Sequence, residues 1–386
     1  MSLSPRQRVL CALNHEEPDR VPLFIGVCGA TTVLGPGYQR LTDLLGVPKQ
    51  PARWFSKPLQ YTWMDDEVLL RLESDGRGLA PGPAESVLRK EISADCLIDD
   101  WGVTWRRAPG SLYFEMAEAP LRHATIDDIE RYPWPKLTGA ARFEGLAERA
   151  RAIQQAGYAT VLLSGVTIFE QAGLMRGLDA LLMDMAGDQE FFTALMEKIK
   201  RMAVDCAAEL LRHVGPFVDV IVTGDDLGMT DGPMMSPPSY RRLIKPHEAE
   251  LLAVMHKNSP AKVFFHSCGN VYRFLGDLAE IGVDLLNPVQ VSAGEMGDTA
   301  RLKREFGDRL SFCGGIDTQR VMPRGMPAEV RQEVRRRIGD LAPGGGYVAS
   351  AVHCLQPDVP AENIVAMCDE VRVAGRYPLD VRRETT

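Results

Sequence analysis

Segments with helical periodicity alternate with short apolar runs from about residue 140 to the end of the chain. The apolar runs have the length of buried strands, and short connections separate them from the helical segments. Strands and helices that alternate in this way form a parallel sheet, because each helix returns the chain to the edge where the next strand begins. We count seven strands, at residues 21–27, 159–165, 217–223, 262–266, 284–286, 310–313 and 347–350.

This pattern predicts an α/β protein with a (β/α)8 barrel of the TIM type. Seven strands are one short of closure, and a barrel needs roughly 250 residues, whereas the chain has 386. The excess falls at residues 28–150, where prolines and aromatic residues are scattered. We therefore expect one domain over residues 1–386, with residues 28–150 as an insertion after the first strand. This insertion should carry helices and a small hairpin and cap the barrel.

Composition narrows the class of protein. Hydrophobic residues make up 45% and charged residues 25% of the chain, as in ordinary globular proteins. The net charge of −8 and the lack of a basic run argue against nucleic acid as a partner. No apolar stretch reaches about 18 residues and the N-terminus lacks a signal-peptide core, so we expect a cytoplasmic protein without a membrane partner. Eight cysteines without a CxxC pair disfavour a disulfide framework and a zinc ribbon.

Polar side chains follow the ends of the predicted strands, where barrel enzymes place their chemistry. His266 and Cys268 come directly after the apolar run KVFF. Residues i and i+2 of a strand point to the same side, so we expect the imidazole and the thiol to face one point. Nitrogen and sulfur together are ligands that zinc accepts. For this pair alone, the alternative is a buried cysteine beside a hydrogen-bonded histidine.

Further candidate metal ligands follow the end of a second predicted strand. Cys354, preceded by His353, lies just beyond the predicted strand GGYVAS. Two ligands from one strand and a third from a distant strand would form a three-ligand zinc site with an open position, which is typical of catalytic zinc. We take Cys354 as the third ligand and His353 as its alternative. Cys313 also ends a strand, but we expect it in the core.

Four carboxylates also lie near strand ends. Asp225 and Asp226 follow the strand VIVTG, and two adjacent acids cannot both lie in a dry core. One of them is expected at the barrel mouth as a general base, as a group that orients a ligand, or as a hydrogen-bond acceptor. The alternative is that one caps the following turn. Glu170 is either a fourth metal ligand or an ordinary paired carboxylate. Asp317 is either a site acid or a helix cap.

Six segments of the chain resemble the uroporphyrinogen decarboxylase superfamily. They are DDLGMTDGPMMSPPSYRRLIKPH, KVFFHSCGNV, DLLNPVQVSA, GDRLSFCGGIDTQ, PGGGYVASAVHCLQPDVPAENI and RQRVLCALNHEEPDRVP. The resemblance is weakest between residues 30 and 130, and it implies a (β/α)8 barrel. It also implies one of two chemistries. One is decarboxylation of the acetate arms of uroporphyrinogen without a metal, and the other is corrinoid-dependent methyl transfer, often with zinc.

The sequence departs from the decarboxylases after the first strand. In those enzymes an arginine-rich loop holds the substrate's carboxylates, whereas here no Lys or Arg occurs between Arg20 and Arg40. The resemblance to the methyltransferase branch implies zinc on His266, Cys268 and Cys354, next to a methylcobalamin. None of the seven histidines belongs to a DxHxxG corrinoid-binding motif. The cobalamin is therefore expected on a separate corrinoid protein.

The sequence thus predicts a zinc-dependent methyltransferase that moves a methyl group between a small methoxylated or methylated substrate and a corrinoid protein. Asp225 and Asp226 are the predicted catalytic carboxylates. The predicted substrate-binding residues are Glu170, Asn287, Gln290, Asp317 and His353. One alternative is a cofactor-independent decarboxylase of a small carboxylic acid or porphyrinogen-like substrate, and another is a non-catalytic carrier of a corrinoid or tetrapyrrole. Family members are often dimers, so a homodimer is compatible with this prediction.

Overall fold

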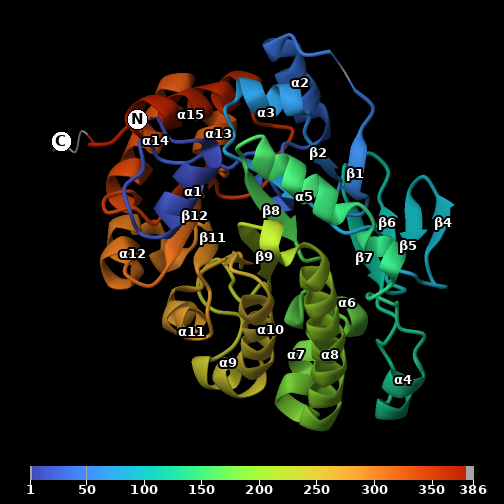
Figure 1. Cartoon of the computed structure of the whole chain (residues 1–386). Helices are drawn as coiled ribbons and strands as arrows, with labels where there is room; N and C mark the ends of the chain where they lie inside the picture. Colours follow the sequence, from blue (N-terminus) through green and yellow to red (C-terminus); the bar gives the residue numbers. More distant parts are fainter. Residues whose placement is uncertain (1, 49, 380–386) are drawn as a thin grey trace.

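The computed structural model describes residues 2–48 and 50–379. At its centre is a curled sheet of seven parallel strands in the order β13-β12-β11-β10-β9-β8-β3 (Figure 1). Each strand after β3 pairs with the one that precedes it along the chain, as in a barrel built from successive strand–helix units. The strands are β3 (Gly76–Leu79), β8 (Ala159–Leu163), β9 (Val220–Gly224), β10 (Lys262–His266), β11 (Leu285–Val289), β12 (Ser311–Ile316) and β13 (Tyr347–Ala351).

Residues 21–27 lie between the two edges of this sheet. Leu23 forms a parallel bridge with Ala349 of β13, and the amide of Phe24 donates to the Ala349 carbonyl at 3.0 Å. On the other side, the amide of Asp75 donates to the Leu23 carbonyl at 2.9 Å. The segment thus occupies the eighth position of the barrel, although its ladder is too short to count as a regular strand. The predicted fold class, an α/β barrel, is confirmed.

Side chains alternate between the inside and the outside of the barrel. One compact cluster fills the interior, and the larger core lies between the strands and the surrounding helices. The interior cluster consists of Val9, Leu13, Phe24, Val27, Cys28, Ala159, Val161, Val220, Phe264, Leu285, Cys313 and Val348. Cys313 is fully buried there, as the sequence predicts. Because Phe264 and Leu285 point inward, the residues two positions further on, His266 and Asn287, point toward the carboxyl-terminal mouth.

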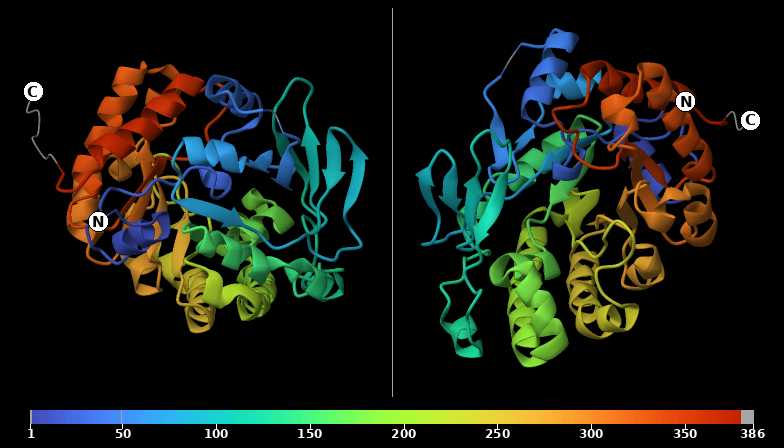
Figure 2. Two further views of the ribbon diagram at one scale, coloured as in Figure 1. Left: turned by 45° about the horizontal axis from the view of Figure 1, so that its top comes forward. Right: turned by 180° about the vertical axis from the view of Figure 1, so that it is seen from behind.

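Helices surround the barrel, and Figure 2 shows them from two further directions. Helix α1 (Pro5–Leu13) is capped by Ser4, whose hydroxyl accepts from the backbone amide of Gln7. The other helices around the barrel are α5 (Leu146–Gln155), α6 (Phe169–Arg176), α7 (Leu178–Gly187), α8 (Gln189–Val214), α9 (Pro237–Leu243), α10 (Lys245–Asn258), α11 (Leu275–Glu280), α12 (Thr299–Phe306), α13 (Val321–Arg324), α14 (Pro327–Leu341) and α15 (Ala361–Ala374). None of the helices in the described part of the chain is long and apolar enough to cross a membrane.

The range 28–150 is not one continuous insertion, because it contains the barrel strand β3. The sequence GRGL of this strand has little apolar character, and this is why the strand count missed it. A side chain at Gly76 would press on Phe24, and one at Gly78 would collide with the ring of Trp63. The neighbouring aromatic rings thus fill the space that apolar side chains fill in the other strands.

Two small antiparallel sheets and three helices make up most of the remainder of this range. They lie beside the barrel rather than within it (Figure 1). The predicted small hairpin is present as β1 (Arg53–Ser56) and β2 (Tyr61–Trp63), and a separate four-stranded sheet follows β3. These other elements are β4 (Lys90–Ser93), β5 (Cys96–Ile98), β6 (Thr104–Arg107), β7 (Phe114–Glu118), α2 (Gly35–Leu45), α3 (Asp66–Arg71) and α4 (Ile126–Arg131).

Candidate metal centre

His266 and Cys268 meet at the mouth of the barrel. His266 is the last residue of β10, and the Nε2 atom of its ring lies 3.3 Å from the Sγ atom of Cys268. Both side chains are partly exposed, in contrast to Phe264 below them. The geometric prediction that the imidazole and the thiol face one point is confirmed.

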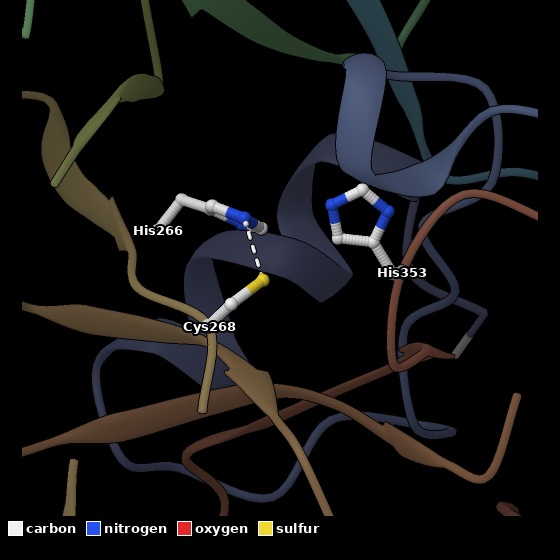
Figure 3. A group of neighbouring side chains, drawn as sticks. All are labelled: His266, Cys268 and His353. Atoms are coloured by element: carbon white, nitrogen blue, oxygen red, sulfur yellow. Dashed lines mark hydrogen bonds between the residues drawn. The ribbon is translucent and has the colours of Figure 1, made fainter. Parts of the chain in front are cut away.

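His353 completes a three-residue cluster. It follows β13, and its ring lies edge-on to that of His266 with 5.3 Å between the ring centroids. The ligand atoms of His266, Cys268 and His353 all lie within 4.8 Å of one another (Figure 3). Around a tetrahedral zinc, ligand atoms are separated by about 3.3–3.8 Å. The cluster is therefore close to the spacing that a zinc ion requires, and small side-chain rotations would complete the fit.

Cys354 lies directly beside this cluster. Its Sγ atom is 3.0 Å from the Nδ1 atom of His353 and accepts a 3.4 Å hydrogen bond from the side-chain Nε2 atom of Gln356. The hydroxyl of Tyr61 also forms a hydrogen bond with the Cys354 side chain. The structure thus brings both candidates for the third ligand to the mouth and places His353 closer to the other two ligands.

Without a cation nearby, the thiols of Cys268 and Cys354 stay protonated at neutral pH. Burial raises the pKa of the Cys268 thiol well above its usual value, and the carboxylates of Asp226 and Glu170 raise it further. Burial raises the pKa of Cys354 to about 12, despite the hydrogen bonds from Tyr61 and Gln356. A divalent cation would supply the positive charge that such thiols need in order to ionise. The donor set therefore fits a zinc ion.

Burial and the nearby His266 lower the pKa of His353 to about 4. Its imidazole is consequently neutral at pH 7, which is the form that can bind a metal. Neither His353 nor the two thiols would carry a charge at neutral pH in the absence of a cation.

The backbone around Cys268 is held by two predicted mouth residues. A carboxylate oxygen of Asp226 accepts from the Cys268 amide at 2.7 Å, and the Gln290 side chain accepts from the Gly269 amide at 2.8 Å. Gly269 has φ +86°, and a side chain there would collide with the backbone of Gly228. The chain can therefore turn away from the site immediately after Cys268.

Asp225 organises the neighbouring loop. Its buried carboxylate accepts from the amides of Ile168 and Glu170, at 3.1 and 2.7 Å, where α6 begins. Burial raises the pKa of Asp225, and the charge of Glu248 adds to this. Of the two adjacent acids, Asp225 thus points into the protein, while Asp226 is partly exposed next to the thiol.

Glu170 and Asp317 differ in their surroundings. The side chain of Glu170 is exposed at its surface, yet the surrounding protein desolvates its carboxyl group. This desolvation, with the charges of Asp226 and Asp225, raises the pKa of Glu170 to about 8. Asp317 accepts from the amides of Gln319 and Arg320 at 2.7 and 3.4 Å and so caps a turn.

Sequence reasoning missed Tyr61. This residue begins β2, and its ring packs with Phe55 at a centroid distance of 5.7 Å. A side chain at Gly29 would overlap the Tyr61 ring, so the glycine is needed for the ring to lie over the mouth. The sequence has no signal for this placement, because it depends on how the hairpin folds back over the barrel.

A family model described as uroporphyrinogen decarboxylase (URO-D) matches residues 113–373. This range includes all the strands from β8 to β13 and more than half of the chain. The chain belongs to the uroporphyrinogen decarboxylase family. The predicted resemblance to this family is therefore confirmed.

Within this family, the chain is similar to curated uroporphyrinogen decarboxylases over part of its length. It is 27% identical over 152 residues to that of Thioalkalivibrio sulfidiphilus, covering 38% of this chain and 40% of the relative. It is 22% identical over 182 residues to that of Legionella pneumophila, covering 47% of this chain and 49% of the relative. The matched region thus spans less than half the length of each of these relatives.

A solved structure supports the fold over nearly the whole chain. A methyltransferase from Methanosarcina mazei superposes with a TM-score of 0.66 at 17% sequence identity. The match covers 96% of this chain and 99% of that chain. At this identity the likeness shows the shared fold, including the elements that precede residue 113.

The loop after the first barrel strand is closely packed. The Thr31 hydroxyl accepts from the amides of Val27 and Cys28, at 3.0 and 3.1 Å, and these residues are buried. The stretch between Arg20 and Arg40 contains no Lys or Arg, so it brings no cation to the barrel mouth. A member of the uroporphyrinogen decarboxylase family with this loop lacks charge-assisted partners there for a polycarboxylate.

Proposed function

We propose that the chain is a zinc-dependent methyltransferase that moves a methyl group between a small methoxylated or methylated substrate and a corrinoid protein. The observation that carries this proposal is the convergence of His266, Cys268 and His353, with Cys354 alongside, at the barrel mouth. A nitrogen and sulfur donor set is the kind that zinc prefers, and three protein ligands leave a position for substrate.

In this proposal His266, Cys268 and Cys354 bind the zinc, and His353 supports Cys354 or replaces it. The zinc would act as a Lewis acid on the heteroatom that carries the methyl group. Asp226 and Gln290 hold the loop that presents Cys268 and so keep its thiolate in place. Asp225 holds the backbone that carries Glu170.

Glu170 is the proposed proton donor. When the methyl group leaves as a cation equivalent to a reduced corrinoid, the substrate heteroatom keeps the bonding electron pair. A proton is then needed to neutralise an alkoxide or phenolate. With its pKa raised to about 8, the Glu170 carboxyl is largely protonated at pH 7 and is suited to donate this proton.

The corrinoid is proposed to arrive on a partner protein, because the sequence has no DxHxxG motif. The partner would have to present its cobalt at the mouth formed by the ends of β10 and β13. A homodimer and a cytoplasmic location remain part of the proposal.

A metal-free decarboxylase is the second candidate, and the names of the curated relatives favour it. The neutral loop between Arg20 and Arg40 argues against a polycarboxylate substrate, so the acid would be small. Release of carbon dioxide from such an acid by the metal-free protein would support this candidate over methyl transfer.

The test has two steps. Elemental analysis of the purified chain should find one zinc, and the zinc should be lost in Cys268→Ala but kept in Cys96→Ala, which changes a cysteine of β5. The zinc-loaded chain should then demethylate an aryl ether, a methylamine or a thioether in the presence of a reduced corrinoid protein, followed by the cobalt absorption spectrum. Absence of zinc after reconstitution, or no change in the cobalt spectrum with any donor, would contradict the proposal.

A further inference from the structure

Asn287 makes contacts that the proposed function does not yet use. It lies in β11 directly beside His266 of β10 in the parallel ladder, and its side chain is completely buried. Its Oδ1 atom lies 2.6 Å from the Nδ1 atom of His266. Its Nδ2 atom donates to the backbone carbonyl of Cys313 at 3.2 Å. Both polar ends of the amide are therefore engaged by the protein.

The Cys313 carbonyl determines which way the Asn287 amide points. A carbonyl oxygen can only accept a hydrogen bond, so the NH2 end of the amide must face it. The Oδ1 end then faces His266 and can only accept. The Nδ1 atom of His266 must therefore carry a hydrogen, and in the neutral ring the Nε2 atom keeps a free lone pair.

This tautomer suits a metal ligand. The bare Nε2 atom is the one that lies 3.3 Å from the Sγ atom of Cys268, in the cluster with His353. The opposite tautomer would direct an N–H group at the metal position and prevent binding. Metal-bound histidines commonly donate their other ring nitrogen to a carbonyl or carboxylate oxygen, which holds both the tautomer and the ring orientation.

We infer that Asn287 is a positioning residue that fixes His266 in the Nδ1–H tautomer and presents Nε2 to the metal, rather than a residue that binds substrate. This inference deepens the proposed function and rests on it for the identity of the metal. The chain of contacts from the Cys313 carbonyl through Asn287 to His266 joins three consecutive barrel strands. The ring is thus oriented by the barrel itself.

The tautomer can be read directly from nitrogen chemical shifts. Metal-free protein labelled with 15N-histidine would be studied at pH 8.5, well above the average histidine pKa, with His266→Ala for assignment. We expect a protonated Nδ1 and an unprotonated Nε2 for His266 in the unaltered protein. Asn287→Leu should lose this preference, and Asn287→Asp, which keeps an acceptor, should retain it.

Asn363→Leu is the matched control. Asn363 is also buried and donates to the carbonyls of Met322 and Gly325, but it lies in helix α15 and forms no hydrogen bond with His266. A general effect of replacing a buried asparagine would appear in this variant too. A protonated Nε2 in the unaltered protein, or an unchanged tautomer in Asn287→Leu, would overturn the inference.

Metal affinity gives the second readout. Competition with a chelator should show zinc binding about 10–100-fold weaker in Asn287→Leu, as is typical when the partner of a metal-bound histidine is removed. Asn287→Asp should recover most of the affinity, and Asn363→Leu should leave it unchanged. Equal affinity in Asn287→Leu and the unaltered protein would overturn the positioning role. Because neither readout requires methyl transfer, their failure is distinguishable from failure of the proposed reaction.

Discussion

The Nδ1 atom of His353 lies 3.0 Å from the Sγ atom of Cys354. These adjacent residues follow the last barrel strand, and His353 lies in the cluster with His266 and Cys268. If both bound the metal, four protein ligands would close the site, as in structural zinc centres. If only one binds, a position remains open for substrate. Whether one or both of His353 and Cys354 bind therefore decides whether the centre can be catalytic.

We predict that Cys354 is the ligand and that the His353 ring supports it by donating a hydrogen bond from Nδ1. Cys354→Ala should therefore lose stoichiometric zinc, whereas His353→Ala should keep it with roughly 10–100-fold lower affinity. Zinc content and chelator competition would measure this. The cobalt-substituted protein should show the absorption of two thiolate ligands in His353→Ala, and this absorption should be lost in Cys354→Ala. Loss of zinc from His353→Ala alone would assign the ligand role to the histidine.

Tyr61 should control the acidity of Cys354. Its hydroxyl lowers the pKa of this thiol, which burial raises to about 12. Tyr61→Phe removes the hydrogen bond, so the pKa should rise further and the thiolate fraction at pH 9 should fall. Alkylation of Cys354 in the metal-free protein, followed by mass spectrometry, should be slower in Tyr61→Phe than in the unaltered protein. Faster alkylation in Tyr61→Phe would mean that the ring acts only as a cover.

Glu170 should make the stability of the metal-free protein depend on pH. Its pKa is raised from 4.5 to about 8 in the folded state, so its contribution is fully present below about pH 4.5 and is lost as the pH rises through about 8. Glu170→Gln should remove this loss. Because the side chain reaches solvent, the effect is discounted to a rise in Tm of roughly 1–3 °C at pH 9 and none at pH 5.

Thermal unfolding between pH 5 and pH 9 would test this, with Glu130→Gln on the exposed face of α4 as the control. A lower Tm for Glu170→Gln at pH 9 would show that the ionised carboxylate is stabilising and would contradict the assignment of Glu170 as a proton donor.

Asp75 should be essential for closing the barrel. Its fully buried carboxylate accepts from Arg8 at 2.6 Å, from Arg20 at 2.9 Å and from the amide of Leu23 at 2.8 Å. Asp75→Ala would take the buried carboxylate away from both arginines, although Arg8 would keep Asp19 and Arg20 the more distant Glu73. We expect a loss of about 3–5 kcal/mol in the free energy of unfolding. Asp66→Ala removes an exposed partner of Arg77 and should cost at most about 1 kcal/mol. Urea unfolding would compare the two, and similar losses would contradict the role of Asp75.

The sequence predicted those features that depend on neighbours along the chain. The alternation of helices and strands and the convergence of His266 with Cys268 follow from local periodicity and spacing. The sequence did not predict strand β3, because its inward positions are Gly76 and Gly78. Aromatic rings from other segments fill the space beside these glycines. A strand shows no apolar pattern in its own sequence when the apolar atoms that pack there belong to other segments of the chain.

The sequence by itself determined that the chain forms an α/β barrel with histidine and cysteine side chains at its strand ends. Only the tertiary structure decided that His353 lies closer than Cys354 to the other ligands, that Tyr61 covers Cys354, and that Asn287 is held between His266 and Cys313. The physical reason is that periodicity fixes the face on which a side chain lies. The distance between residues of different strands and loops depends instead on barrel register, closure and the path of the connecting chain.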